Sequence, residues 1–173
     1  LDISMIDDVK RAENVQYMKD MMRVAGRFQP QYLVLHPSAE PIAPDEREQR
    51  LANSHASIGE LAPVAKEIGA VLCIENLPRT CLGQNGEEMM RLIEGYDEVG
   101  LCFDTNHLLY QRHADYLKAV EKGKIKTVHL SDYDFADERH LSPGKGLIDN
   151  QALWAGIREN GYEGIMMFEC YGE

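Results

Sequence analysis

The chain has 173 residues, of which 44% are hydrophobic and 27% charged, and its formal net charge is −11. This length suits one domain, which we expect to span residues 1–173. No stretch approaches the roughly 18 uninterrupted apolar residues of a membrane span, and the first residues show no secretion signal, so we expect a cytoplasmic protein with no membrane partner. Nucleic acid is disfavoured as a partner, because binding phosphates takes clustered Lys and Arg.

Helix-type and strand-type patterns alternate along the chain. Apolar residues recur at three- and four-residue steps over residues 4–27, and Ser4 is placed to cap this first helix. A short apolar run at 32–36, closed by Pro37, is typical of a strand buried on both faces. The alternation continues with helices expected at 51–68, 86–94, 114–121 and 150–160, and with strands expected at 71–75, 99–104, 125–130 and 165–169. Strict alternation predicts parallel β/α units with helices covering the sheet.

One connection between the expected strands is longer than most and is rich in turn residues. His129 and Glu169, near the ends of the last two strands, are 40 positions apart, and the segment between them holds Pro143, Gly144 and Gly146. Long connections in compact domains usually carry function. We therefore expect a functional loop over 131–149, with a short extra strand near 139–141.

The four cysteines, Cys73, Cys81, Cys102 and Cys170, show no CxxC spacing. Three of them lie inside apolar runs, which favours buried thiols in a reducing compartment over a zinc–thiolate site. Cys81 differs because it lies in a polar stretch, where we expect it to be exposed and reactive.

Each of the five expected strands ends in a residue that can bind a metal ion: His36, Glu75, Asp104, His129 and Glu169. In parallel α/β proteins the ligand site lies at the carboxyl ends of the strands, and in a closed barrel those ends converge on one pocket. An unpaired buried charge is costly, so a carboxylate or imidazole at the end of an apolar strand needs a partner. Because oxygen and nitrogen ligands suit Mn, Mg, Co or Zn, a shared metal ion explains the set.

Short motifs around these residues resemble the xylose-isomerase-like barrels, a family that includes sugar and sugar-phosphate isomerases and epimerases, ketose epimerases and the endonuclease IV type of abasic-site nuclease. The resemblance covers nearly the whole chain and is carried by Leu35-His36-Pro37, Ile74-Glu75-Asn76, Phe103-Asp104-Thr105-Asn106-His107, Val128-His129-Leu130-Ser131-Asp132, Arg139 to Gly146, and Phe168-Glu169. It implies an α/β fold, the (β/α)8 TIM barrel. Such a barrel takes about 250 residues, so we expect an incomplete one, with strands three to eight present and the first two strands and the last helix absent.

The resemblance also implies a metal-dependent reaction on a sugar, a sugar phosphate or a polyol. One divalent metal ion (Mn, Mg, Co or Zn) would be held by Glu75, Asp104, His129 and Glu169, and no nucleotide cofactor is implied. In an isomerase or epimerase of this kind, Glu75 and Glu169 remove and return a proton on the carbon next to a metal-polarised carbonyl. An aldose–ketose isomerase that moves a hydride instead is an alternative.

Four residues would contact the sugar substrate: His36, His107, Arg139 and His140. The nuclease branch of the family binds three zinc ions, and the three histidines of this set stand where that branch has extra ligands, with Glu138 in place of an aspartate. The charge of −11 ranks a nuclease second. A dehydratase on the same scaffold and a non-catalytic barrel that binds a sugar or a protein are further alternatives, and a homo-oligomer stays open.

Overall fold

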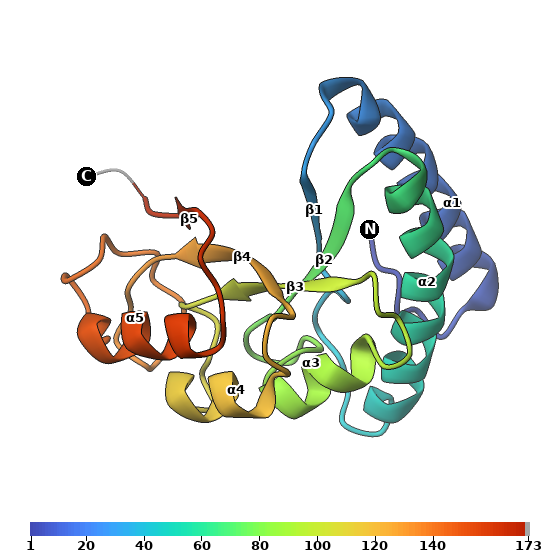
Figure 1. Ribbon diagram of the computed structural model, residues 1–173. Helices are drawn as coiled ribbons and strands as arrows, with labels where there is room; N and C mark the ends of the chain where they lie inside the picture. The colour runs from blue at the N-terminus through green and yellow to red at the C-terminus, as the bar shows by residue number, and fades with distance from the viewer. Residues whose placement is uncertain (172–173) are drawn as a thin grey trace.

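The computed structural model describes residues 1–171 and contains a parallel sheet in the order β1-β2-β3-β4-β5. Its strands are β1 (Tyr32–Leu35), β2 (Val71–Glu75), β3 (Gly100–Asp104), β4 (Ile125–Leu130) and β5 (Met166–Phe168). The helices are α1 (Asp8–Ala25), η1 (Gly26–Phe28, a 3-10 turn), α2 (Arg47–Glu67), α3 (Gly86–Leu92), α4 (His113–Ala119) and α5 (Asn150–Glu159). In Figure 1 the helices form an arc around the strands, from α1 and α2 through α3 and α4 to α5.

The repeated β/α unit builds part of a barrel. All four strand pairs are parallel, and β1 and β5 stand at the two edges of the sheet. This half-barrel confirms the expected incomplete TIM barrel. Strands three to eight would be six strands, whereas residues 1–171 form five. The sixth is the extra strand expected near 139–141, and that expectation is wrong.

The segment between β4 and β5 folds as a loop around one buried carboxylate. Asp132 accepts hydrogen bonds from the backbone N–H groups of Gly144 at 2.8 Å and Ile148 at 3.0 Å. Where we expect the extra strand, the described residues form a single antiparallel bridge between Asp132 and Leu141. Backbone donors of this loop are satisfied by the Asp132 side chain, which removes the need for a strand partner.

The first helix begins later than the sequence pattern predicts. α1 starts at Asp8, and the carboxylate of Asp7 caps it by accepting hydrogen bonds from two backbone N–H groups of the first turn, both at 3.1 Å. Ser4 is not the cap, because its backbone N–H and hydroxyl both donate to Asp2 Oδ1. A carboxylate at this position also interacts favourably with the positive end of the helix dipole.

A hydrophobic core between the sheet and the helices holds the strands in place. Ile74, Leu101 and Phe103 are fully buried, and the Phe103 ring stacks on Tyr116 of α4 with centroids 4.8 Å apart. Burying such a side chain is worth about 1.5–3 kcal/mol. The strand ends therefore project from a packed and rigid wall. No helix within residues 1–171 combines the length and apolar character that a membrane crossing requires.

The expectation that Cys81 is exposed is wrong. Cys81 is buried in the loop between β2 and α3, and its carbonyl oxygen accepts a hydrogen bond from Arg47 Nη2 at 3.0 Å. The same guanidinium forms a two-pronged ion pair with Glu88, with N–O distances of 2.8 and 2.7 Å. Polar groups of the neighbouring helices α2 and α3 therefore pair with this loop and with each other, and the loop is covered although its sequence is polar.

Candidate metal centre

The predicted site residues lie at the end of the sheet that is formed by the carboxyl ends of its parallel strands. Pairing in register places Glu75 of β2 opposite Cys102 of β3, and Asp104 of β3 opposite His129 of β4. Because successive side chains of a strand point to opposite faces, these four share the face turned away from the helices. Glu169 directly follows β5, and its backbone N–H is still bonded to β4.

Four donor side chains from four consecutive strands converge on one point. His129 Nδ1 lies 3.1 Å from Glu75 Oε1, 2.9 Å from Glu169 Oε2 and 3.9 Å from Asp104 Oδ2. The donor atoms of all four residues lie within 4.8 Å of one another. One imidazole and three carboxylates at this spacing form a donor set for a divalent cation.

Asp104 provides a test of whether these residues fit a metal ion. Its side chain is fully buried, and Oδ1 accepts a hydrogen bond from the Asn106 backbone N–H at 2.7 Å. Oδ2 is also buried and has no hydrogen-bond partner. An unsatisfied oxygen of a buried carboxylate is strongly unfavourable. Since Oδ2 lies 3.9 Å from His129 Nδ1, and Asp104 belongs to the four-residue group, the residues fit a bound cation.

The electrostatics of the cluster are dominated by crowded carboxylates. Burial raises the pKa of Glu75, but hydrogen bonds with His129 and His36 outweigh this effect and bring the pKa to about 2. Burial raises the pKa of Asp104 well above its ordinary value, and the negative charge of Glu75 raises it further. The hydrogen bond to Glu75 raises the pKa of His129. Positive charge at this point therefore stabilises the cluster.

Two histidines that we predict as substrate contacts lie beside Glu75. His36 Nε2 is 3.3 Å from Glu75 Oε2, and the His36 side chain is 61% exposed, so it can reach a ligand from solvent. His107 is buried, with Nδ1 2.9 Å from the carbonyl oxygen of Asn76 and 3.8 Å from Glu75 Oε1. Burial lowers the pKa of His107. A neutral imidazole that donates from Nδ1 to this carbonyl matches the geometry.

The loop between β4 and β5 brings His140 to the site but directs the Arg139 guanidinium elsewhere. His140 Nδ1 lies 3.0 Å from the carbonyl oxygen of Glu169, and its ring centroid lies 5.9 Å from that of His107. Arg139 Nε donates instead to a carboxylate oxygen of Asp134 at 3.0 Å, on the exposed side of the loop. The predicted contact between Arg139 and substrate would require the guanidinium to leave Asp134.

Asn76 has a positioning role for which the sequence analysis makes no prediction. Its Nδ2 donates to the carbonyl oxygen of Asp104 at 2.9 Å, and its Oδ1 accepts from the Asp104 backbone N–H at 2.8 Å. Asn76 is fully buried, so these bonds fix the backbone of Asp104 while the Asn76 carbonyl orients His107. The available signal is an amide side chain next to Glu75, at the end of an apolar strand, where a buried polar group needs partners.

Glu138 joins His107 and His140 in a second group of donors. Its Oε2 lies 3.3 Å from His107 Nε2, and its Oε1 accepts from Arg79 Nη2 at 2.6 Å. The donor atoms of the three residues lie within 4.8 Å of one another. The sequence predicts Glu138 only as the counterpart of a nuclease ligand, and the structure places it beside His107, which in turn lies 3.8 Å from Glu75 Oε1.

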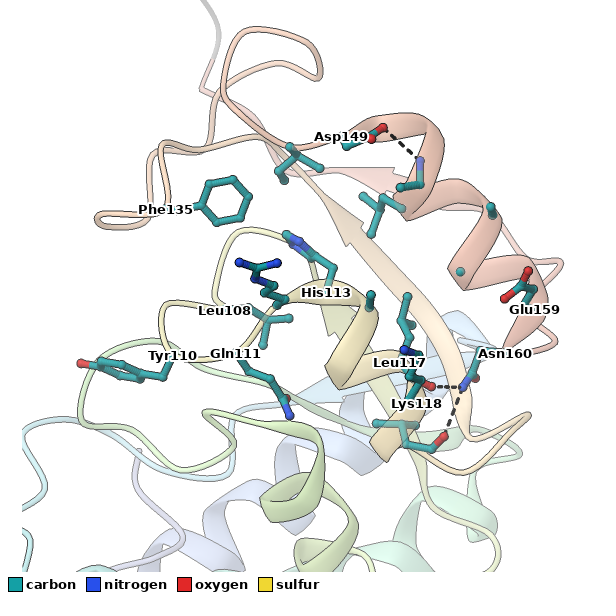
Figure 2. A pocket seen from close by; sticks show the side chains of 18 of the residues that line it. Leu108, Tyr110, Gln111, His113, Leu117, Lys118, Phe135, Asp149, Glu159 and Asn160 are labelled. Carbon is teal, nitrogen blue, oxygen red and sulfur yellow. Dashed lines mark hydrogen bonds between the residues drawn. The ribbon is translucent and has the colours of Figure 1, made fainter.

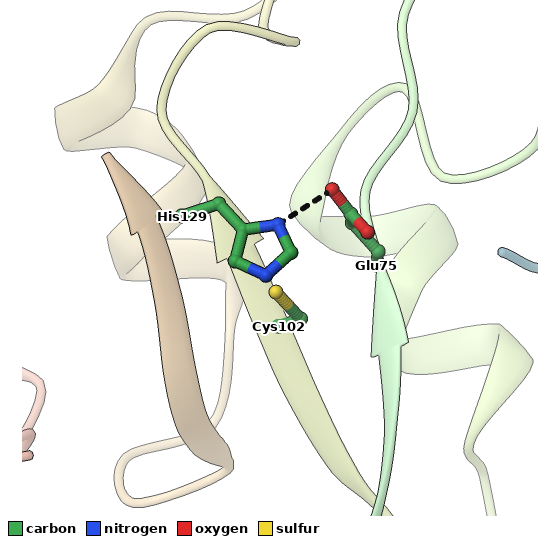
Figure 3. Close-up of side chains that lie close together, drawn as sticks. All are labelled: Glu75, Cys102 and His129. Carbon is green, nitrogen blue, oxygen red and sulfur yellow. Dashed lines mark hydrogen bonds and ion pairs between the residues drawn. The ribbon is translucent and has the colours of Figure 1, made fainter. Parts of the chain in front are cut away.

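Cys102 is a further donor beside the centre. Figure 3 shows Glu75, Cys102 and His129 projecting toward one another, and their donor atoms lie within 4.8 Å of one another. Burial strongly raises the pKa of the Cys102 thiol, and the nearby carboxylate of Glu75 adds to this effect. The free thiol is therefore neutral and becomes a strong ligand only when a cation displaces its proton.

A separate groove lies between α4 and α5 (Figure 2). Apolar side chains that include Leu108, Leu117, Phe135 and Ile148 line it. None of the strand-end donors contributes to its lining. The groove is therefore distinct from the candidate metal centre.

The fold and the site together define a class: parallel β/α-barrel proteins that carry carboxylate and histidine donors at the carboxyl ends of their strands. The family model described as xylose isomerase-like TIM barrel matches residues 2–173. The chain therefore belongs to the xylose isomerase-like TIM barrel family, as its motifs predict.

Relatives and solved structures agree with this membership. An inosose dehydratase of Lacticaseibacillus casei is 26% identical over 153 residues, which cover 76% of this chain and 49% of the relative. A crystal structure of a D-tagatose 3-epimerase-like protein has a TM-score of 0.87 at 23% identity and covers 98% of this chain and 67% of that chain. The structure of the IOLI protein with a zinc atom has a TM-score of 0.82 at 22% identity, with 97% and 64% coverage. The chain spans about half the length of the curated relatives it matches.

Proposed function

We propose that this chain carries the metal centre of a divalent-metal-dependent isomerase or epimerase that acts on a sugar, a sugar phosphate or a polyol. The observation that carries the proposal is the convergence of Glu75, Asp104, His129 and Glu169 around the unpartnered Oδ2 of Asp104. The epimerase-like neighbour and the zinc atom of the IOLI structure support a metal-dependent reaction on a small polar substrate.

The two glutamates are placed for proton transfer. When bound, a divalent ion supplies a positive charge that polarises a substrate carbonyl. Glu75 and Glu169 approach His129 from different strands, with N–O distances of 3.1 and 2.9 Å. One carboxylate can therefore take the proton from the carbon next to the carbonyl while the other returns a proton to it. Such a transfer needs no nucleotide cofactor.

The surrounding histidines are placed to hold the substrate. His36 and His107 stand beside Glu75, and His140 stands beside the backbone of Glu169. The Nδ1 atoms of His107 and His140 face backbone carbonyl oxygens, so their Nε2 atoms can accept hydrogen bonds from sugar hydroxyl groups. Arg139 would join them only by leaving Asp134. These polar groups beside a carbonyl-binding cation support a sugar, a sugar phosphate or a polyol as the substrate class.

The experiment is a turnover assay of the purified protein after chelator treatment, with Mn, Mg, Co or Zn added back. A panel of ketoses, aldoses and inososes in D2O is followed by NMR. Proton transfer predicts metal-dependent conversion with deuterium appearing at the carbon next to the carbonyl, whereas hydride transfer leaves that carbon unlabelled. Absence of both conversion and exchange with every metal would overturn the proposal.

A matched pair of variants separates an enzyme from a binding protein. Glu169→Gln removes the proposed acid/base group with little change in shape, and rates should fall about 10²- to 10⁴-fold. Glu163→Gln makes the same change at an exposed position of the preceding loop, and rates should not change. A sugar-binding barrel would instead show ligand binding, no turnover and equal affinity in both variants.

A dehydratase is the second candidate, because the Lacticaseibacillus casei relative is an inosose dehydratase. Removing a proton next to a carbonyl is also the first step of losing water from a sugar, so the same glutamates would serve. The products distinguish the two reactions: an epimer or isomer keeps the mass of the substrate, whereas a dehydrated product is lighter by one water. Mass spectrometry of the same reactions provides this test.

A zinc-dependent nuclease has one observation in its favour, the second donor group of His107, Glu138 and His140. The net charge of −11 opposes binding to a phosphate backbone. Metal analysis and an abasic-site duplex decide the matter. Several zinc ions per chain together with cleavage of the duplex would replace the isomerase proposal.

A further inference from the structure

Cys102 lies within the proposed metal centre although none of the proposed functional roles uses it. Pairing in register places it opposite Glu75 on the neighbouring strand, so both side chains point to the inner face of the sheet. Cys102 is fully buried, and its Sγ lies within 4.8 Å of donor atoms of Glu75 and His129 (Figure 3). A thiol, a carboxylate and an imidazole therefore form a three-donor group.

A second observation shows that this part of the protein is built for a cation. Asp104 is fully buried, and its Oδ2 has no hydrogen-bond partner but lies 3.9 Å from His129 Nδ1. His129 and Glu75 thus belong to two overlapping donor groups. One group is completed by the oxygens of Asp104 and Glu169, and the other by the sulfur of Cys102.

The two groups differ in the ions that they prefer. Carboxylate oxygens suit hard cations such as Mg²⁺ and Mn²⁺, whereas a thiolate selects softer ions such as Zn²⁺. Ligands of one zinc ion lie about 2.0–2.3 Å from it, so small side-chain rotations bring the three donors of the sulfur group onto a single ion. Both groups use Glu75 and His129, and two divalent cations held by the same pair of side chains repel each other, so filling one position disfavours filling the other.

We propose that the centre holds one ion in either of two positions, an outer position with Asp104 and Glu169 for hard cations and an inner position with Cys102 for thiophilic cations such as Zn²⁺, Co²⁺ and Cd²⁺. This inference rests on the proposed metal centre. When the inner position fills, the sulfur–metal bond forms and the thiol proton leaves to solvent. Glu169 is then free of the ion, so the identity of the metal decides which carboxylates remain available for proton transfer.

The experiment compares Cys102→Ser with Cys73→Ser. Cys73 is an equally buried thiol, two residues before Glu75 and on the same face of β2, but it lies outside the donor group of Figure 3. One equivalent of Co²⁺ is added to each chelator-treated protein, and the near-ultraviolet thiolate-to-cobalt charge-transfer band is recorded. The band is expected in the wild type and in Cys73→Ser, and it should be absent in Cys102→Ser.

Affinities measured by titration provide the second readout. Cd²⁺ affinity should fall at least about tenfold in Cys102→Ser, the lower end of what loss of a supporting group costs a metal site. Mn²⁺ affinity should be unchanged, which also shows that the variant is folded. A charge-transfer band that survives in Cys102→Ser, or that disappears in Cys73→Ser, would overturn the proposal.

X-ray absorption on the wild type tests the same point without any substitution. With one equivalent of Zn²⁺, the inner position predicts a sulfur neighbour at about 2.3 Å. A shell of oxygen and nitrogen alone would overturn the two-position inference but leave the proposed metal centre standing. Failure to bind any divalent ion would overturn both.

Discussion

Replacing Asn76 with Ala should weaken the metal centre without touching any of its ligands. The substitution removes two buried hydrogen bonds, which join the Asn76 amide to the backbone N–H and C=O of Asp104. Each bond is worth about 1 kcal/mol, and a buried backbone group left without a partner costs about 1–3 kcal/mol. A loss of about 3 kcal/mol is expected, which is a large part of a typical stability of about 5–15 kcal/mol.

The assay for this prediction combines unfolding with metal titration. With a urea dependence of about 2 kcal/mol per molar, a loss of about 3 kcal/mol lowers the unfolding midpoint by about 1.5 M. Because Asp104 is no longer fixed, Mn²⁺ affinity should also fall about 10- to 100-fold, as when a supporting residue is removed from a metal site.

Asn160 provides the matched control. It is a buried asparagine whose Nδ2 donates to the backbone carbonyls of Leu117 and Val120, at 3.0 and 3.2 Å, on the helix side of the sheet. Asn160→Ala should therefore lose comparable stability and retain Mn²⁺ affinity. If Asn76→Ala bound Mn²⁺ as tightly as the wild type, the idea that Asn76 positions Asp104 would be refuted.

Two further predictions concern the loop between β4 and β5 and its neighbours. Gly146→Ala places a methyl group against the Asp132 side chain and the Tyr133 backbone, so about 1–3 kcal/mol of stability should be lost. Lys145→Ala changes an exposed neighbour and should leave stability unchanged. Equal melting temperatures for the two variants would contradict the close packing at Gly146. Burial lowers the pKa of His113, whose Nε2 lies 2.7 Å from the carbonyl oxygen of Thr105. As the pH drops, this imidazole is therefore protonated in the unfolded chain before it is protonated in the folded one, and stability falls below about pH 6.5. His113→Gln cannot titrate, and its stability deficit relative to the wild type should be smaller at pH 5 than at pH 8; a deficit independent of pH would disprove the assignment.

Most of the fold is predictable from the sequence because its strands are short apolar runs with polar ends. β2 at Val71–Glu75 and β4 at Ile125–Leu130 have the predicted bounds, since a strand buried on both faces leaves an unbroken signal. The loop between β4 and β5 is not predictable in the same way. Its backbone donors bond to the side chain of Asp132, and no local pattern reveals which side chain fills that role.

The candidate site is predictable to the extent that it depends on strand ends. The carboxyl ends of parallel strands lie at the same end of a sheet, and this brings together Glu75, Asp104, His129 and Glu169. The role of Asn76 depends on a bond to a residue 28 positions later in the chain, and the proximity of Cys102 to Glu75 depends on strand register. Contacts of this kind are set by pairing in three dimensions, so one sequence does not specify them.

The account predicts that a divalent ion binds through the carboxylate of Asp104. Asp104→Asn keeps the shape of the side chain, and its amide oxygen can still accept the Asn106 hydrogen bond, but the negative charge at the unpartnered Oδ2 is lost. The most direct test is titration of Mn²⁺ into the chelator-treated wild type and this variant, followed by electron paramagnetic resonance of free Mn²⁺. One ion per wild-type chain and a large loss of binding in Asp104→Asn are predicted, whereas equal binding by the two proteins, or no binding by the wild type, would contradict the metal centre.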